Sequence, residues 1–182
     1  MNIINKGILI SGIFALTLLA GTACAASTQV DIHRVTKDGQ SEKVGKVTIE
    51  ETAYGLVFTP DLKGLASGGH GFHIHAKGDC GPGPDATTGE TIAAGAAGGH
   101  YDPNKTDKHG MPWDENSHLG DLPLLYVDGK GVANTPVLAP RLKNLDQVKN
   151  RALMIHEGGD NYSDHPKPLG GGDGRISCGV IR

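Results

Sequence analysis

The stretch Gly71-Phe72-His73-Ile74-His75 sets large apolar side chains and imidazoles at alternate positions. Successive side chains of a β-strand point to opposite faces, so Phe72 and Ile74 would enter a core while His73 and His75 share the other face. We therefore expect a strand here. Two imidazoles on one face of a strand can bind a single metal ion.

Other short apolar or alternating segments recur along the chain between turn signals. They span 30–32, 44–49, 56–58, 124–127, 132–137, 152–155 and 178–181. Lys37-Asp38-Gly39 predicts a hairpin between the first two of them. Only 142–151 could hold a helical turn or two. Seven or eight short strands with few helices favour an all-β antiparallel sandwich or barrel.

Two long stretches, 76–121 and 157–174, lack strand signals. Loops of this length are usually functional or disordered. The first holds Cys80, three histidines and the only tryptophan, so we expect an ordered, functional loop. No internal repeat or second boundary is visible, which predicts a single domain over 26–182.

The composition agrees with strands and loops. Among 182 residues there are 28 glycines but few aromatics (Trp 1, Tyr 4, Phe 3). Average usage would give roughly 7% glycine, so this chain has about twice the usual content. A helical bundle has little use for so many glycines. The formal net charge of −3 gives no argument for nucleic-acid binding.

Residues 1–25 have the pattern of a secretory signal. Lys6 precedes an apolar run, and the segment ends in the small residues Ala23-Cys24-Ala25. Cleavage after Ala25 would leave a mature chain without stable membrane insertion. An uncleaved anchor is disfavoured because the run is short for a membrane span. Lipidation at Cys24 is a weaker alternative, since Gly21-Thr22-Ala23 lacks the usual aliphatic residue.

Cleavage would leave two cysteines, Cys80 and Cys178, in an exported chain. Disulfides form and persist in oxidising compartments. We therefore expect a Cys80–Cys178 disulfide, with two free buried thiols as the alternative.

Histidine spacing predicts metal binding. Six of the nine histidines fall between residues 70 and 118. The pattern His100-x8-His109-x8-His118-x2-Asp121 offers three imidazoles and a carboxylate, a plausible tetrahedral zinc set. Imidazole-rich sites also suit copper. His156 ends another apolar strand. A lone histidine is more often structural, but five or six in this arrangement favour metal ligation.

Four separated motifs resemble the copper,zinc superoxide dismutase family. In order they are 71–75, Gly99-His100-Tyr101-Asp102-Pro103, His118-Leu119-Gly120-Asp121-Leu122-Pro123, and Gly174-Arg175-Ile176-Ser177-Cys178-Gly179-Val180-Ile181. The insertion around Cys80 and the segment 160–164 resemble the bacterial periplasmic branch. The resemblance covers essentially the whole mature chain. It implies an eight-stranded antiparallel Greek-key β-sandwich or barrel whose two long loops form the metal site.

The resemblance also implies one copper and one zinc ion per subunit. It assigns copper to His73, His75, His100 and His156. It assigns zinc to His100, His109, His118 and Asp121, so that His100 bridges the two ions. Asp160 matches an aspartate that links a copper-ligand and a zinc-ligand histidine. His70 matches a structural position, while His33 and His165 match no ligand and are expected on the surface.

The implied activity is dismutation of superoxide to dioxygen and hydrogen peroxide by redox cycling of copper, as antioxidant defence in the periplasm. In the family's cycle His100 releases copper on reduction, takes up a proton and returns it to the nascent peroxide. Arg175 would hold the superoxide anion beside copper. Zinc would order the loop and tune His100. A metal-binding or copper-delivery protein without turnover is the alternative, and a purely structural sandwich would leave the ligand-type side chains unexplained.

Two questions stay open at the level of sequence. Lys77, Lys105 or Lys167 could steer superoxide, because the family's charged positions before Arg175 do not transfer to this chain. Met111 and Trp113 are candidates for a homodimer contact, with packing inside the loop as the alternative.

Overall fold

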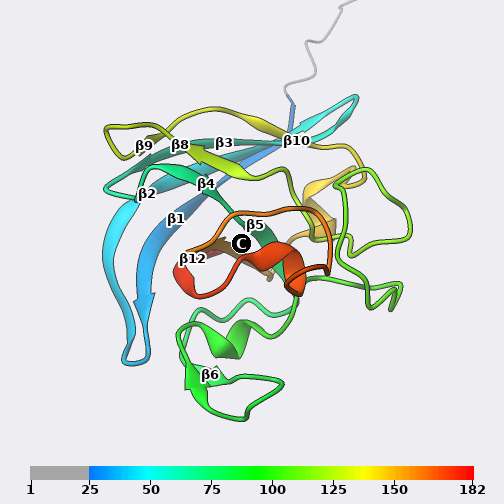
Figure 1. Cartoon of the computed structure of the whole chain (residues 1–182). Helices are drawn as coiled ribbons and strands as arrows, with labels where there is room; N and C mark the ends of the chain where they lie inside the picture. Colours follow the sequence, from blue (N-terminus) through cyan, green and yellow to red (C-terminus); the bar gives the residue numbers. More distant parts are fainter. Residues whose placement is uncertain (1–24) are drawn as a thin grey trace, which may run out of the picture.

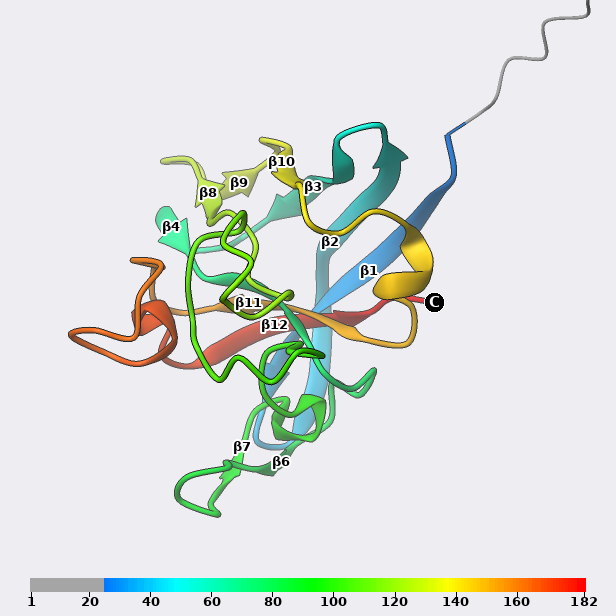
Figure 2. The same cartoon turned by 90° about the vertical axis from the view of Figure 1, so that its right-hand side faces the viewer.

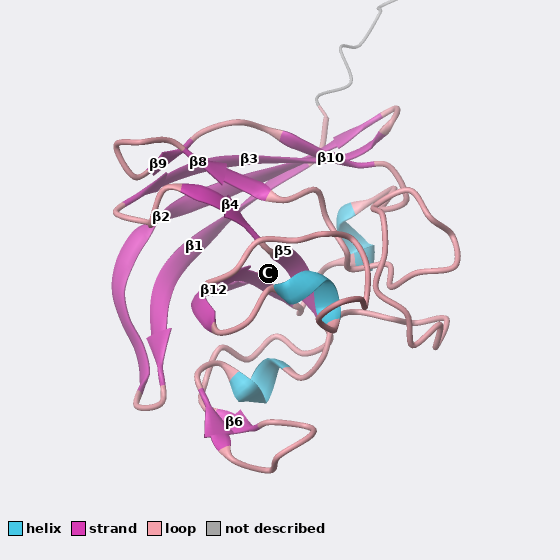
Figure 3. Ribbon diagram, in the orientation of Figure 1, coloured by secondary structure: helices cyan, strands magenta, loops and turns pink. Residues whose placement is uncertain are grey.

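Residues 25–182, which the computed structural model describes, form twelve β-strands and three single-turn 3-10 helices. The strands are β1 (Ser27–Thr36), β2 (Gly39–Thr52), β3 (Gly55–Lys63), β4 (Gly68–His70), β5 (Phe72–His75), β6 (Gly83–Pro84), β7 (Thr91–Ile92), β8 (Leu125–Val127), β9 (Val132–Ala133), β10 (Val137–Ala139), β11 (Ala152–His156) and β12 (Arg175–Val180). The helices are η1 (Gly95–Ala97), η2 (Leu145–Gln147) and η3 (Leu169–Gly171). Figure 3 shows how much of the remainder is loop.

Eight of the strands form one antiparallel sheet. Its order is β10-β3-β2-β1-β12-β11-β5, with β9 also paired to β3. β3 is near one end of this order and β5 is at the other end. The chain therefore crosses the barrel between these two strands. In Figure 1, β3 and β8 to β10 form an upper layer, and β5 and β12 lie beneath them. The predicted all-β antiparallel fold is confirmed.

The curled sheet closes around an apolar core. Phe58 on β3 and Phe72 on β5 meet edge to face, with ring centroids 6.0 Å apart. Strands that are distant in the pairing order thus touch across the interior. Ile74 and Leu153 lie in the same fully buried cluster. Each such side chain contributes about 1.5–3 kcal/mol relative to exposure, so a core with few aromatics still holds the barrel.

The outer faces of β11 and β12 are buried as well. Ala152, Met154 and Cys178 form a second apolar cluster with Cys80 and Ala97 of the long loop. The part of the loop around Cys80 and η1 therefore packs against the sheet, whereas the segment around β6 and β7 projects from the barrel (Figure 2). This covering is why β11 is buried at every position.

The Cys80–Cys178 disulfide is confirmed, and it closes a sequence separation of 98 residues. Reduction, or a Cys80→Ser/Cys178→Ser variant, should lower the free energy of unfolding by up to about 4–5 kcal/mol in the chain-entropy model. Metal retention should fall too, because the released loop carries His100. Thermal unfolding with metal analysis tests this. A reduced protein that keeps full metal occupancy would contradict the second expectation.

Local structure agrees with the sequence expectation at one helical turn and differs from it in five short elements. The helical turn expected within 142–151 is η2, which a capping box between Asn144 and Gln147 starts. The turns η1 and η3 and the short strands β6 and β7 were not predicted, since each depends on contacts within the long loops, and β4 was not predicted because it forms only by pairing with the distant strand β8. Within 25–182, no helix is long and apolar enough to cross a bilayer. Of the predicted signal, residues 1–25, only Ala25 is among the described residues. Residues 1–24, Cys24 included, lie outside them.

Candidate metal centre

The histidines of β5 are placed by the alternation that the sequence suggested. Phe72 and Ile74 enter the core, and His73 and His75 lie buried on the opposite face. On the neighbouring strand, Met154 pairs with His73 and Ala152 with His75. His156 ends β11 opposite Gly71, and its ring centroid lies 4.9 Å from that of His73 and 5.5 Å from that of His75.

The long loop supplies the other histidines by pairing with β5. β5 is the last strand in the sheet order, so one of its edges has backbone groups that no other strand of the sheet pairs. The loop makes hydrogen bonds to these groups. Ile74 donates to the Gly120 carbonyl at 2.9 Å and accepts from the Tyr101 amide at 2.8 Å. Bridges also join His73 to Asp121 and His75 to His100. Backbone pairing thus brings both ends of the His100–Asp121 segment to one strand.

Four histidine nitrogens converge at the first candidate site. The ligand atoms of His73, His75, His100 and His156 all lie within 4.8 Å of one another. His75 Nε2 and His156 Nε2 are 3.3 Å apart. Within the described residues, His73 Nδ1 and His100 Nε2 are buried without hydrogen-bond partners. Buried polar atoms are normally paired, so a metal ion explains these nitrogens better than an apolar core does.

The first site favours neutral imidazoles. Burial and the neighbouring histidines hold the pKa values of His75 and His156 well below the usual range. Burial, together with the neighbouring His73, lowers the pKa of His100 to about 3. A neutral imidazole is the form that binds a metal. The set of four nitrogen donors suits copper.

Three further nitrogens surround one carboxylate oxygen. The Nδ1 atoms of His100, His109 and His118 lie 2.9, 3.1 and 3.4 Å from Asp121 Oδ1. Burial raises the pKa of Asp121, but the three imidazoles around its carboxylate outweigh burial and hold this pKa well below the usual range. Three imidazoles and an ionised carboxylate are a donor set that fits zinc.

The tightest geometric grouping at this second site differs from the predicted zinc set. It joins His73, and not His118, to His100, His109 and Asp121 within 4.8 Å. His73 Nδ1 already belongs to the first site, and its Nε2 donates to Asp160. His118 lies slightly farther out but still faces Asp121 Oδ1. We therefore retain His118 in the second site.

Asp160 joins the two sites. Its carboxylate accepts hydrogen bonds from His73 Nε2 and His109 Nε2, each at 2.8 Å. Burial lowers the pKa of His109, but its bonds to Asp121 and Asp160 outweigh burial and raise the pKa to about 9. A metal ion at Nδ1 would displace a proton there. Carboxylates in this position orient metal-binding imidazoles.

Glycine allows the second long loop to approach Asp160. Gly170 has φ +71°, and a Cβ there would lie 2.1 Å from Asp160 Oδ1 and 2.7 Å from His109 Nε2. Gly172 similarly lies against the His156 ring. Glycine at these two positions therefore lets the backbone pass close to the candidate ligands.

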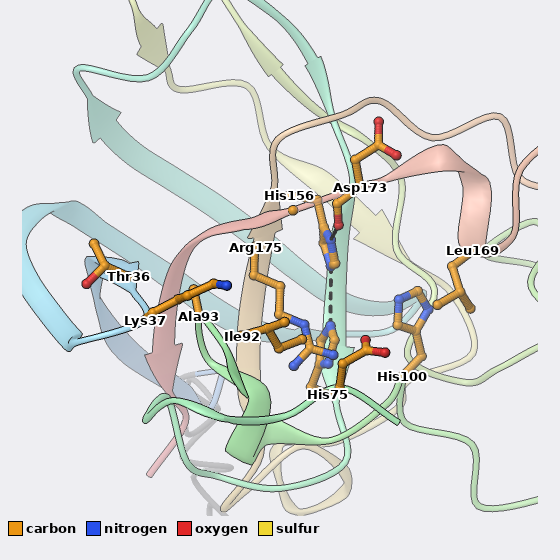
Figure 4. A pocket seen from close by; sticks show the side chains of 12 residues that line it. Thr36, Lys37, His75, Ile92, Ala93, His100, His156, Leu169, Asp173 and Arg175 are labelled. Atoms are coloured by element: carbon orange, nitrogen blue, oxygen red, sulfur yellow. Dashed lines mark hydrogen bonds between the residues drawn. The ribbon is translucent and has the colours of Figure 1, made fainter. Parts of the chain in front are cut away.

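A cavity of about 540 Å³ opens over His75, His100 and His156. Figure 4 shows Arg175 beside His75 in this cavity. Its guanidinium donates to the carbonyls of Ala94 and Gly98, each at 2.7 Å. Burial lowers the pKa of Arg175, but from a value high enough that the group stays charged at neutral pH. The cavity therefore presents a fixed cation next to the first site.

The other histidines lie outside the two sites. Both ring nitrogens of His70 are 2.8 Å from backbone carbonyls, those of His156 and Ala66. His70 thus ties β4 to β11, as expected of a structural residue. His33 is near the Ser41 carbonyl, and His165 is exposed.

Sequence reasoning missed Arg141, which holds the loop between the second-site histidines. Its guanidinium donates to Pro112 O at 2.9 Å, to Ser117 O at 3.0 Å and to the His118 carbonyl. No local pattern marks an arginine in a loop for this role. Trp113 is 64% exposed and Met111 38%. The alternative that the tryptophan packs inside its loop is therefore wrong.

A family model described as copper/zinc superoxide dismutase matches residues 43–181. The chain belongs to the copper/zinc superoxide dismutase family. It is 60% identical over 144 residues to the copper-zinc superoxide dismutase of Pasteurella multocida, covering 78% of this chain and 75% of that protein. Membership confirms the expected enzyme class and its pair of metals.

Solved structures of superoxide dismutases share the fold. The Brucella abortus copper/zinc enzyme superposes with a TM-score of 0.83 at 45% identity, covering 86% of this chain and all (100%) of that one. The monomeric Salmonella enterica enzyme gives 0.75 at 56% identity, covering 86% and 100%. The predicted barrel of this family is confirmed.

Proposed function

We propose that this chain performs copper- and zinc-dependent superoxide dismutation through a centre in which His100 bridges the two ions. Copper would be held by His73, His75, His100 and His156, and zinc by His100, His109, His118 and Asp121. The observation that carries this proposal is the position of His100, which belongs to both groupings, with Nδ1 facing Asp121 Oδ1 and Nε2 buried without a hydrogen-bond partner among the described residues. When bound, copper supplies the redox couple that oxidises one superoxide to dioxygen and reduces another to hydrogen peroxide.

His100 also transfers a proton in this proposal. Its Nδ1 faces Asp121 Oδ1 at 2.9 Å, while Nε2 is buried at the base of the cavity. Nε2 can therefore accept a proton and donate it to the peroxide anion that forms when superoxide is reduced; with a second proton from solvent this gives hydrogen peroxide. A positioned imidazole is the commonest group for this kind of transfer.

Arg175 binds and orients the anion. Hydrogen bonds to two backbone carbonyls hold its guanidinium in one orientation, so the side chain does not swing out into solvent. The remaining N–H groups can donate to superoxide in the cavity, and the charge favours an anion over neutral molecules. Holding the substrate beside His75 and His100 saves the orientation entropy of an encounter in free solution.

Zinc has an ordering role in this proposal. His109, His118 and Asp121 come from one loop, and an ion would hold them together with His100. The second site is closed by four protein ligands, which is typical of structural zinc. Zinc would thus fix the orientation of His100 and would not activate water.

We also place this activity in the periplasm, as antioxidant defence. The signal-like pattern at 1–25 supports export of a mature domain spanning 26–182. The Cys80–Cys178 disulfide supports an oxidising compartment. Anchoring of the exported chain through a lipid on Cys24 is the alternative.

Homodimer formation is a separate proposal. The exposed side chains of Met111 and Trp113 support it, because aromatic side chains are enriched at interfaces. The Salmonella enterica relative, described as monomeric, favours a single chain. Catalysis as proposed needs residues of one chain alone.

Copper removal tests the function. Dialysis of the metal-loaded protein against a copper chelator should abolish superoxide consumption, and added copper should restore it, because zinc has no redox couple. Protein reloaded with zinc alone is the matched control and should stay inactive. A protein that binds copper stoichiometrically without turnover would instead support the copper-binding alternative.

A further inference from the structure

Besides Arg175, the mouth of the cavity carries charges that the catalytic proposal does not use. The lining includes the cations Lys37 and Arg175 and the carboxylates Asp85 and Asp173. Arg175 is the inner cation, since it lies beside His75 (Figure 4). Lys37 comes from a different element, the turn between β1 and β2, and its amino group points toward the cavity in the same view.

The shape of the β1–β2 hairpin brings its tip to the mouth. Irregularities in the pairing lie between Ile32 and His33 and between His33 and Val35. Such bulges bend a strand and increase its twist. Val35 packs with Cys80 and Cys178 in the outer cluster, so the end of the hairpin is held against the loop that carries η1. The turn residue Lys37 follows two positions later.

The three lysines that the sequence suggested for steering are less suited to act on an incoming anion. Lys77 and Lys105 do not line this cavity. Lys167 lines a neighbouring cavity of about 290 Å³, and its Nζ is 3.2 Å from Asp173 Oδ2. Within 25–182, no ion pair of Lys37 is found, so its charge is not neutralised by a carboxylate in contact.

Asp85 opposes these cations. It belongs to the loop between β6 and β7 and lines both cavities. Its carboxylate accepts from the Thr87 and Thr88 amides at 3.0 and 2.8 Å, which fixes the negative charge at the mouth. The charge also acts on Arg175, because it opposes the lowering of the pKa of that guanidinium.

We propose that Lys37 is the outer positioning residue for superoxide, attracting the anion at the cavity mouth and passing it toward Arg175, while Asp85 slows entry. The proposal rests on the proposed dismutation. The turn between β1 and β2 would then help to set the rate at which superoxide associates with the protein. The effect must be electrostatic, so it must weaken as salt screens the charges.

Pulse-radiolysis measurement of the second-order rate constant against ionic strength tests the assignment. Metal-loaded wild type would be compared with Lys37→Gln, Lys37→Glu and Asp85→Asn. At low salt we expect Lys37→Gln to lower the rate constant about two- to fivefold, Lys37→Glu to lower it further, and Asp85→Asn to raise it. The rate constants should converge above about 0.5 M salt, where the screening length is only a few ångströms.

The matched control is Lys130→Gln, which changes the net charge equally. Lys130 is exposed and does not line the cavity. Copper and zinc contents should be equal in all variants, since none of these side chains is proposed as a ligand. The assignment is overturned if Lys37→Gln and Lys130→Gln have the same effect at low salt, or if the loss persists unchanged at high salt. An inactive metal-loaded wild type would overturn the proposed function itself, which is a different result.

Discussion

Replacing His100 with alanine is expected to lower superoxide consumption by about a hundredfold or more, the size of effect associated with a positioned proton-transfer group. The change removes both ring nitrogens that face the candidate sites. Copper and zinc contents should fall together, because the same side chain is proposed to bind both ions. Elemental analysis and a superoxide assay on one preparation measure the two effects.

His33→Ala is the matched control for this variant. His33 is on β1 near the Ser41 carbonyl and outside both sites, so metal content and rate should stay close to wild type. A His100→Ala protein with full copper, full zinc and an unchanged rate would refute the bridge. Loss of copper alone would show that His100 is not shared with zinc.

Replacing Arg175 with alanine is expected to lower the second-order rate constant about 10- to 100-fold while both metals remain bound. This range corresponds to the loss of a charge-assisted hydrogen bond of about 1.5–3 kcal/mol. Arg175 is near the first site but is not among its grouped donors. The rate constant and the copper content of the same sample provide the measurement.

Arg175→Lys separates charge from geometry. It keeps a cation but loses the planar group that donates to both Ala94 and Gly98 carbonyls, so an intermediate rate is expected. Arg182→Ala, at the exposed end of the chain, should have little effect. Equal rates for wild type and Arg175→Ala would remove this residue from the proposed mechanism.

The parts of the structure that depend on local patterns could be predicted from the sequence. Alternation over 71–75 placed Phe72 and Ile74 inside the barrel and His73 and His75 outside it. Two cysteines left after the signal-like segment allowed only one pairing. The spacing of His100, His109 and His118 before Asp121 predicted a cluster, although not which nitrogen faces which atom.

The remaining features depend on contacts between distant segments. Arg141 holds the loop through carbonyls that no sequence pattern identifies as its partners. Lys37 was interpreted only as a turn residue, because its position over the cavity follows from bulges in the hairpin. The alternative zinc grouping through His73 likewise becomes visible only when β5 and the loop are folded together.

The most direct test of the central claim is the rate of superoxide consumption per bound copper in protein whose copper and zinc have both been counted. One copper and one zinc per chain, with rapid turnover that disappears in the His100→Ala variant, is the result predicted here. One copper per chain without turnover, or turnover that is independent of His100, would contradict a dismutase built on a shared imidazole.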